Sequence, residues 1–256
     1  MKKLLMALFA LTLVFGLSAC GTEEEPEPVI EEGTGYGLVH SHYVGIATVT
    51  LEDGIVTDAS LEEYFLPYSW AKLEVVTEES DELGENEDVF QFTAFGTTYN
   101  MAVYVQIGDK LFSGENVDGS PVWSTDDIAD LEEWLKVEEN AKWYVDQVDE
   151  GNWYIANADG TESDYETLET DASATSIIKS ESGYWDFGHL GWQGNVDATV
   201  DAVIGLDLSE DYDLERLDED EDELRFWAID DTVTGATWSD FPDYFGILVR
   251  AYNNAE

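Results

Sequence analysis

The stretch Asp231-Thr232-Val233-Thr234-Gly235-Ala236-Thr237, followed by Trp238-Ser239, separates a short apolar run from a helical pattern near the end of the chain. Its small residues Gly235 and Ala236 let the backbone turn tightly, so we expect the hydroxyl of Thr237 to stand clear just ahead of a helix. A helix start offers unpaired backbone N–H groups and the positive end of the helix dipole, and both favour a phosphate. The stretch therefore predicts a phosphate site at Thr237.

The flanking residues supply the strand and the helix that this interpretation requires. Residues 224–229 form a short apolar run typical of a strand. After the motif a helix is predicted, with Asp240 as its cap and Pro242 in its first turn, where proline is tolerated. Residues at helical spacing form its apolar face: Phe241, Phe245, Leu248, Val249 and Tyr252.

These residues also resemble a known signature. Asp231-x-x-Thr234-Gly235-Ala236-Thr237 resembles the D-x-x-[ST]-G-A-T motif of FMN-binding domains, found in a subunit of the sodium-pumping quinone reductase and in flavin-carrying lipoproteins of extracellular electron transfer. The resemblance covers seven residues strictly, and Ser239 and the following helix loosely. It implies that a flavin transferase takes FMN from FAD and joins its phosphate to Thr237.

The resemblance also implies roles for the neighbours of Thr237. Thr234 would shape the turn, Asp231 would assist the transferase or hold the loop, and a side chain at Gly235 would crowd the phosphate. We single out Trp238 as an aromatic neighbour of the flavin because it adjoins Thr237. Arg225 and Arg250 are the expected helpers that compensate the phosphate charge. The alternative is an ordinary loop that enters a helix with Thr234 or Ser239 as a cap.

The first residues of the sequence predict a protein that is exported from the cytoplasm. Met1-Lys2-Lys3 and the apolar run 4–17 are typical of a signal peptide over residues 1–19, too short to be a membrane span. Leu17-Ser18-Ala19-Cys20 resembles the bacterial lipobox, so Cys20, the only cysteine, is expected to carry the lipid anchor. Residues 20–35 are predicted to be the lipidated cysteine and a disordered acidic tether, followed by one FMN-binding-like domain over 36–256.

Charge limits the possible partners. Loss of Lys2 and Lys3 with the signal peptide would change the formal net charge from −48 to −50. Such a field repels nucleic acid and anionic lipid headgroups, so we expect no nucleic-acid partner and membrane attachment through the lipid alone. Solubility, or screening of this charge in a saline habitat, is the general explanation of the acidity.

The remaining pattern predicts an α+β fold in which an antiparallel sheet packs against a few helices. Residues 36–65 read as a hairpin around Asp53-Gly54, similar to the opening strands of FMN-binding domains, although residues 64–70 depart from that family. Further strands are predicted at 89–96, 99–107, 176–178 and 196–208. The clearest helix is predicted to start at Ser124 and to end before Gly151.

Two weaker patterns remain. Gly119–Ser124 resembles Gly235–Ser239, as a degenerate duplication would, but it lacks the threonine, so we expect one flavin at most. His40 and His42, with His189, would begin a metal site on one strand face, but no carboxylate or cysteine pattern completes it, and we predict no metal.

Together these observations predict a lipid-anchored flavoprotein at the outer face of the cell membrane, with covalent FMN as cofactor. Its expected partners are a flavin transferase and a membrane redox donor such as a quinone-linked dehydrogenase. We expect electron transfer by the flavin rather than turnover of a substrate. The alternative from another class is a non-enzymatic lipoprotein that binds a sugar or small solute through its aromatic surface.

Overall fold

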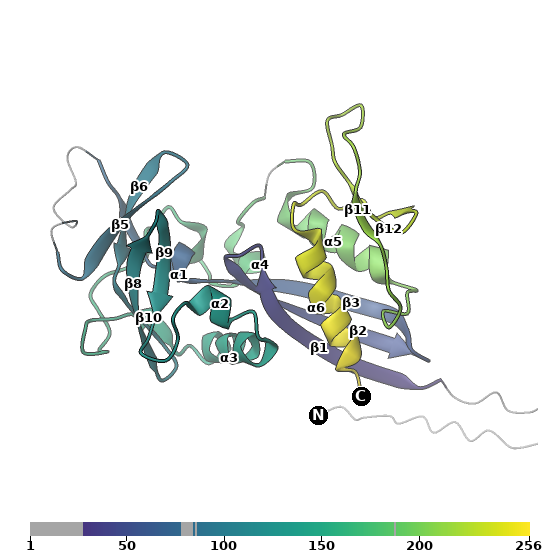
Figure 1. Cartoon of the computed structure of the whole chain (residues 1–256), viewed down its shortest axis with the longest axis horizontal. Helices are drawn as coiled ribbons and strands as arrows, with labels where there is room; N and C mark the ends of the chain where they lie inside the picture. Colours follow the sequence, from purple (N-terminus) through teal and green to yellow (C-terminus); the bar gives the residue numbers. More distant parts are fainter. Residues whose placement is uncertain (1–27, 78–83, 85, 187) are drawn as a thin grey trace, which may run out of the picture.

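The structure is a computed structural model that describes residues 28–77, 84, 86–186 and 188–256 (Figure 1). Within these residues the chain is an α+β protein with four small antiparallel sheets and six α-helices, which confirms the predicted fold class. The predicted signal peptide and Cys20 lie outside the described residues. No helix in the described ranges has the length and apolar character needed to cross a membrane.

The longest sheet has the order β1-β2-β3, with β1 (Ile30–Val39), β2 (Tyr43–Glu52) and β3 (Ile55–Phe65). Asp53 and Gly54 join β2 to β3 with φ angles of 52° and 81°, the positive values that tight hairpin turns need, so the predicted hairpin is confirmed. One expectation is corrected here. Because β1 begins at Ile30, residues 30–35 belong to the sheet and not to a disordered tether.

A row of glycines explains why the start of β1 resembles a linker in sequence. Gly33, Gly35 and Gly37 alternate along its buried face, and helix α6 (Phe241–Asn253) packs on that face. A Cβ atom at Gly33 would lie 2.0 Å from the carbonyl oxygen of Ala251. Glycine is needed here because the helix backbone comes so close to the strand, whereas composition alone suggests a flexible segment.

Helix α5 (Gly191–Val203) occupies a segment that was predicted to be a strand over 196–208. The apparent alternation of valine and alanine with polar residues suggested period two, but two of the buried residues, Asn195 and Thr199, are polar. The buried positions recur at intervals of three and four, as in a helix: Trp192, Asn195, Val196, Thr199 and Val203. α5 packs against β3 and contacts α6.

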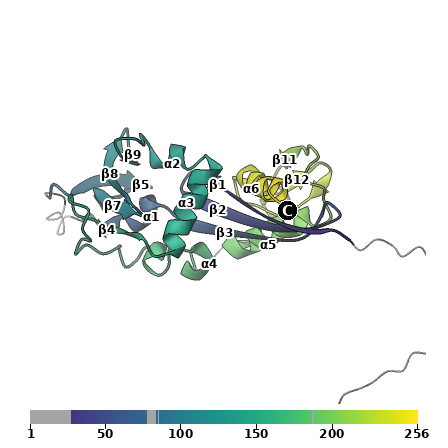
Figure 2. The same ribbon diagram turned by 90° about the horizontal axis from the view of Figure 1, so that it is seen from below.

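Two further sheets lie at the opposite end of the long β1–β3 sheet from α5 and α6, as Figures 1 and 2 both show. One has the order β4-β6-β5, and the other has the order β10-β7-β8-β9. Residues 99–107 were predicted to be one strand, but they divide at Val103 between these two sheets. The strands are β4 (Lys72–Val75), β5 (Val89–Ala94), β6 (Thr97–Ala102), β7 (Tyr104–Ile107), β8 (Lys110–Val117), β9 (Ser120–Ser124) and β10 (Trp153–Ile155).

The helix predicted from Ser124 is two helices. α2 (Leu131–Trp134) starts after Asp130, whose carboxylate accepts hydrogen bonds from the N–H groups of Glu132 and Glu133, and α3 (Glu138–Asp149) follows a break. α3 lies against β1 and β2. The short helices are α1 (Pro67–Trp70), the 3₁₀ turn η2 (Ala172–Ala174) and α4 (Lys179–Ser182). Residues 176–178 form no strand, only one bridge between Ile178 and Tyr64.

The motif begins in a small sheet of order β11-β12-β13. Its strands are β11 (Leu214–Arg216), β12 (Trp227–Ile229) and β13 (Thr232–Val233), and the last of them belongs to the motif. The loop 234–240 then leads into α6, so the predicted order of strand, loop and helix is confirmed. The buried face of α6 is formed by Phe241, Tyr244, Phe245, Ile247, Leu248 and Ala251, which pack on β1 and β2. This packing fixes where the motif can lie.

Candidate functional site

The motif loop borders a pocket of about 370 Å³, here called the motif pocket. Thr237 lines it, and so do three residues that follow Thr237 in the chain. The other walls come from the turn between β1 and β2, the start of β2, α4 with the residues after it, and α6. Its lining is His40, Tyr43, Lys179, Tyr184, Trp185, Thr237, Trp238, Ser239, Asp240 and Tyr244. The fold therefore gathers five aromatic side chains around Thr237.

Thr234 and Gly235 shape the loop that presents Thr237. The hydroxyl of Thr234 donates to the carbonyl of Trp227 at 2.9 Å and accepts from the N–H of Ala236 at 3.1 Å. Gly235 has a φ of 85°, a left-handed conformation in which a side chain is strained. Space is not the constraint, because an added Cβ would meet only Ala198 at 3.8 Å. Asp231 lies exposed in the turn between β12 and β13.

Asn195 of α5 holds the second half of the motif. Its side chain is fully buried, and its Oδ1 accepts hydrogen bonds from the N–H groups of Thr237 at 2.7 Å and Trp238 at 3.1 Å. The same oxygen accepts from the Thr237 hydroxyl at 3.2 Å, while Nδ2 donates to the carbonyl of Gly191 at 2.7 Å. One buried amide therefore fixes both the backbone and the hydroxyl of Thr237.

The expected cradle of backbone N–H groups is only partly available. The N–H groups of Ala236, Thr237 and Trp238 all donate within the protein. Those of Gly235 and Ser239 have no acceptor among the described residues. α6 begins at Phe241, four residues beyond Thr237, so an anion on Thr237 would lie ahead of the helix rather than on its first turn.

The cations near the motif differ from those expected. Arg225 donates to the carbonyl of Leu217, and Arg250, in the last turn of α6, donates to the carbonyl of Tyr36, so neither lies at Thr237. Arg216 of β11 takes this place instead. Its guanidinium donates to the carbonyls of Thr237 at 3.3 Å and Ser239 at 3.4 Å, and lies over the ring of Trp227. Its Nε has no acceptor among the described residues.

A second cation, Lys179, lines the motif pocket. Its Nζ is 2.5 Å from Oε2 of Glu63, and both side chains are almost fully buried, with 4% and 2% exposed. Burial lowers the pKa of the Lys179 ammonium, and the Glu63 carboxylate counteracts part of that shift. The pair brings a positive group next to the aromatic walls of the pocket.

An imidazole and a carboxylate close one side of the motif pocket. His40 Nδ1 pairs with Asp240, which also accepts a hydrogen bond from the Ser239 hydroxyl. Burial alone would raise the pKa of Asp240, but the hydrogen bonds from Ser239 and His40 outweigh it and the pKa is lowered. Asp240 starts α6, yet its side chain makes no capping bond, because it is engaged with His40.

Trp238 is the aromatic floor next to Thr237. Its ring is 4% exposed and stacks on Tyr244, with centroids 3.7 Å apart and planes 4° from parallel. Its indole Nε1 is buried with no acceptor among the described residues. An unpaired buried donor is costly in the protein alone, and an acceptor on a ligand would satisfy it. Burial strongly raises the pKa of Tyr244, which keeps its hydroxyl protonated.

The histidines weighed as metal ligands do not meet. His40 and His42 lie in or beside the turn between β1 and β2, not on one strand face, and His42 pairs with Glu132 at 3.0 Å. His189 lies against Phe226 instead. Within the described part of the chain, no three His, Cys, Asp or Glu side chains are placed to hold a metal ion.

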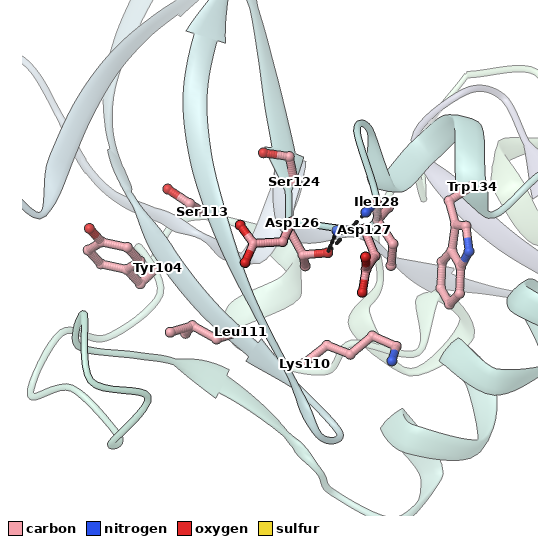
Figure 3. Close-up of a pocket in the computed structure, with 10 residues that line it drawn as sticks. Tyr104, Lys110, Leu111, Ser113, Ser124, Asp126, Asp127, Ile128 and Trp134 are labelled. Carbon is pink, nitrogen blue, oxygen red and sulfur yellow. Dashed lines mark hydrogen bonds between the residues drawn. The ribbon is translucent and has the colours of Figure 1, made fainter.

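A larger pocket, here called the second pocket, has a volume of about 660 Å³ and lies between β7, β8 and the residues that follow β9 (Figure 3). Tyr104 and Trp134 lie at opposite ends of it, with the carboxylates of Asp126 and Asp127 between them. Both carboxylates are exposed, and Thr125 shapes their turn by accepting hydrogen bonds from the N–H groups of Asp127 and Ile128.

The segment that resembles the motif adjoins this second pocket but has a different backbone. Gly119, with a φ of 93°, turns the hairpin from β8 to β9, and residues 120–124 are strand β9. Gly235, in contrast, lies in the loop that leads to α6. The two segments therefore occupy different structural settings.

The geometry defines a class of site: an aromatic-walled pocket with a threonine in its lining and a buried cation in its wall. No family model, curated protein or solved structure matches this chain. Sequence reasoning found Thr237, Trp238, Ser239 and their loop but missed Lys179 and Arg216. A signal was present, since the chain has only 10 basic residues against 58 acidic ones, and each is therefore a candidate partner for an anion.

Proposed function

We propose that this chain carries one FMN, joined by a phosphoester to Thr237, and relays electrons at the outer face of the cell membrane. A lipid on Cys20 would hold it there, and a membrane redox donor such as a quinone-linked dehydrogenase would supply the electrons. The flavin provides the redox chemistry, whereas the chain provides attachment, orientation and a tuned environment. A covalent bond prevents loss of the cofactor by dilution outside the cell.

One observation carries this proposal: Thr237, the residue that the motif designates, lines the aromatic motif pocket. A flavin needs a nucleophile for its phosphate, a flat apolar environment for its ring and compensation for its charge. Thr237 supplies the first and the rings of Tyr43, Trp185 and Trp238 are available for the second. Arg216 lies at the carbonyl of Thr237, where it can compensate the phosphate.

Attachment would be a group transfer catalysed by a flavin transferase. A bond forms between Thr237 Oγ1 and the FMN phosphorus of FAD, the pyrophosphate bond breaks, and AMP leaves while the hydroxyl loses its proton. The carboxamide of Asn195, which accepts a hydrogen bond from this hydroxyl, would hold its oxygen in place. Thr234 and Gly235 keep the loop in the conformation that presents it.

Coexpression of the full chain with a flavin transferase tests the proposal. We expect one FMN-phosphoryl mass on a peptide containing Thr237 and the visible absorption of a flavin in the purified protein. Thr237→Ala should remove both signals, while the fold stays intact because losing one loop hydroxyl typically costs about 0.5 kcal/mol or less. Thr234→Ser should still be modified, because serine retains the hydroxyl that shapes the turn.

Thr232→Ala is the matched control, because Thr232 is an exposed threonine of the same segment. It should be modified like the parent. The proposal fails if the parent gains no mass under conditions that modify a known acceptor, or if Thr237→Ala is modified as fully as the parent.

The alternative function, a lipoprotein that binds a sugar or small solute, rests on the second pocket. Tyr104 and Trp134 could pack against a sugar ring there, with Asp126 and Asp127 as hydrogen-bond acceptors. Two results together would favour this alternative. The protein coexpressed with a flavin transferase would show no flavin absorption, and Trp134→Ala would lower its affinity for a panel of soluble sugars.

A further inference from the structure

In the buried ion pair of Lys179 and Glu63, the lysine is the partner nearer to the motif pocket. Lys179 lines the pocket, whereas Glu63 lies behind it and is not part of the lining. The Lys179 Nζ is 3.8 Å from the ring centroid of Tyr43 and 5.4 Å from that of Tyr184, and both rings line the same pocket. The pair therefore presents its positive end to the space beside Thr237.

Glu63 is held by two side chains. Besides Lys179, it accepts a hydrogen bond from the indole Nε1 of Trp192 at 2.7 Å. Burial and the nearby Glu63 carboxylate together raise the pKa of the Tyr244 hydroxyl. These contacts keep the carboxylate behind the ammonium, so the orientation of the pair is fixed by the core. Charge-assisted hydrogen bonds of this kind are stronger than those between neutral groups.

Stability is a poor explanation for such a pair. Taking two charges out of water costs several kcal/mol per ion, and apolar residues of similar volume often replace a buried pair without loss of stability. A buried cation that lines a ligand pocket is better explained by a ligand whose charge it faces. Cations are also few in this chain, which has 10 basic residues against 58 acidic ones.

We propose that Lys179 raises the reduction potential of a flavin carried on Thr237, by placing a fixed positive charge beside its ring. This inference rests on the proposed function. When a flavin takes up two electrons and one proton at neutral pH, its ring gains one negative charge. A nearby cation in a poorly solvated site stabilises that charge and thus favours the reduced form. The carboxylate that lines the pocket, Asp240, is already paired with His40.

Redox titration of the flavin-loaded, full-length protein with dithionite, in the presence of a mediator dye, tests this inference. Dithionite donates the electrons and is oxidised to sulfite, and flavin absorption reports the potential. The test variant is the double substitution Glu63→Gln with Lys179→Met, which removes both charges and leaves an amide oxygen to accept from Trp192. Lys179→Arg retains the charge. Lys142→Met removes an exposed lysine of α3 as a control.

The double variant should take up one flavin, because Thr237 is unchanged, and its potential should fall below that of the parent. Lys179→Arg and Lys142→Met should remain close to the parent. A loaded double variant with the parental potential would overturn the inference while leaving the flavin on Thr237 in place. So would a natively folded double variant that takes up no flavin, because Lys179 would then serve attachment. A parent that takes up no flavin overturns the proposed function itself, and this inference with it.

Discussion

The two pockets differ in a way that volume does not capture. The motif pocket is the smaller, at about 370 Å³ against 660 Å³. It is lined, however, by the lysine of a buried ion pair and by a buried indole that has no acceptor among the described residues. The second pocket is lined largely by exposed or half-buried polar side chains, among them Asp126 and Asp127. Polar groups that are removed from water are costly, so the motif pocket has the arrangement that a ligand would explain.

The largest expected effect comes from breaking the buried pair behind the motif pocket. Glu63→Ala would leave Lys179 buried without its carboxylate, and such a change typically costs about 3–5 kcal/mol of unfolding free energy. Urea unfolding followed by tryptophan fluorescence measures this cost. Asp146→Ala is the control, because its partner Lys142 is exposed, and it should leave the urea midpoint nearly unchanged. If the two variants lowered the urea midpoint equally, the buried pair would be no more important for stability than the exposed pair, and the prediction would be wrong.

Two fully buried asparagines allow a similar comparison between uncharged groups: one has its carbonyl oxygen hydrogen-bonded and the other does not. Asn195 holds the motif loop through three accepted hydrogen bonds, whereas the Oδ1 of Asn100, on β6, has no donor among the described residues. Asn195→Ala should therefore cost about 2–3 kcal/mol of unfolding free energy, because it leaves buried donors without an acceptor. Asn100→Ala should cost about 1 kcal/mol less, since it removes only the bond to Glu74. The reverse order in urea unfolding would contradict the role assigned to Asn195.

A third comparison tests the close packing of α6 on β1. Gly33→Ala would push a methyl group into the backbone of α6 and should cost about 1–3 kcal/mol, the usual range for overpacking. Gly246→Ala, on α6 itself, meets no atom within 4 Å and should stabilise the helix by about 0.5–1 kcal/mol. Thermal unfolding should show shifts of opposite sign. If Gly33→Ala is neutral, residues 30–35 are not held in the sheet.

The smallest effect is expected in the other half of the molecule. Phe95 is fully exposed at the tip of the β5–β6 hairpin with a φ of 50°, next to Gly96 with a φ of 84°. Hairpin turns with two positive φ angles prefer Asn-Gly, and a bulky aromatic residue is strained there. Phe95→Asn should raise stability by about 0.5–1 kcal/mol in thermal unfolding. A loss of stability would show that Phe95 makes a contact that compensates its strain.

Sequence patterns succeeded where local chemistry decides the structure. Asp53-Gly54 predicts its turn because few other dipeptides accept two positive φ angles. The spacing of Phe241, Phe245 and Leu248 predicts α6 because only a helix places them on one face. The loop from Thr234 to Asp240 was likewise predictable from its small and hydroxylated residues.

Sequence patterns failed where distant residues decide. Gly33 and Gly35 resemble a linker until α6 is placed on them, more than 200 residues later. α5 resembles a strand because its buried face includes Asn195, whose partners lie on the motif loop. Lys179 gives no local signal of its role, since only the fold brings it to Glu63 and Thr237.

The contact between the first and last described elements also affects the order of folding. β1 and α6 pack against each other, and the backbones of Glu32 and Glu256 exchange two hydrogen bonds. Contacts this far apart in sequence require a large loop to close, which slows folding and keeps the early strands exposed until α6 has been synthesised. Because α6 covers the glycine face of β1, we expect the sheet to be fully buried only after the last helix has docked on it.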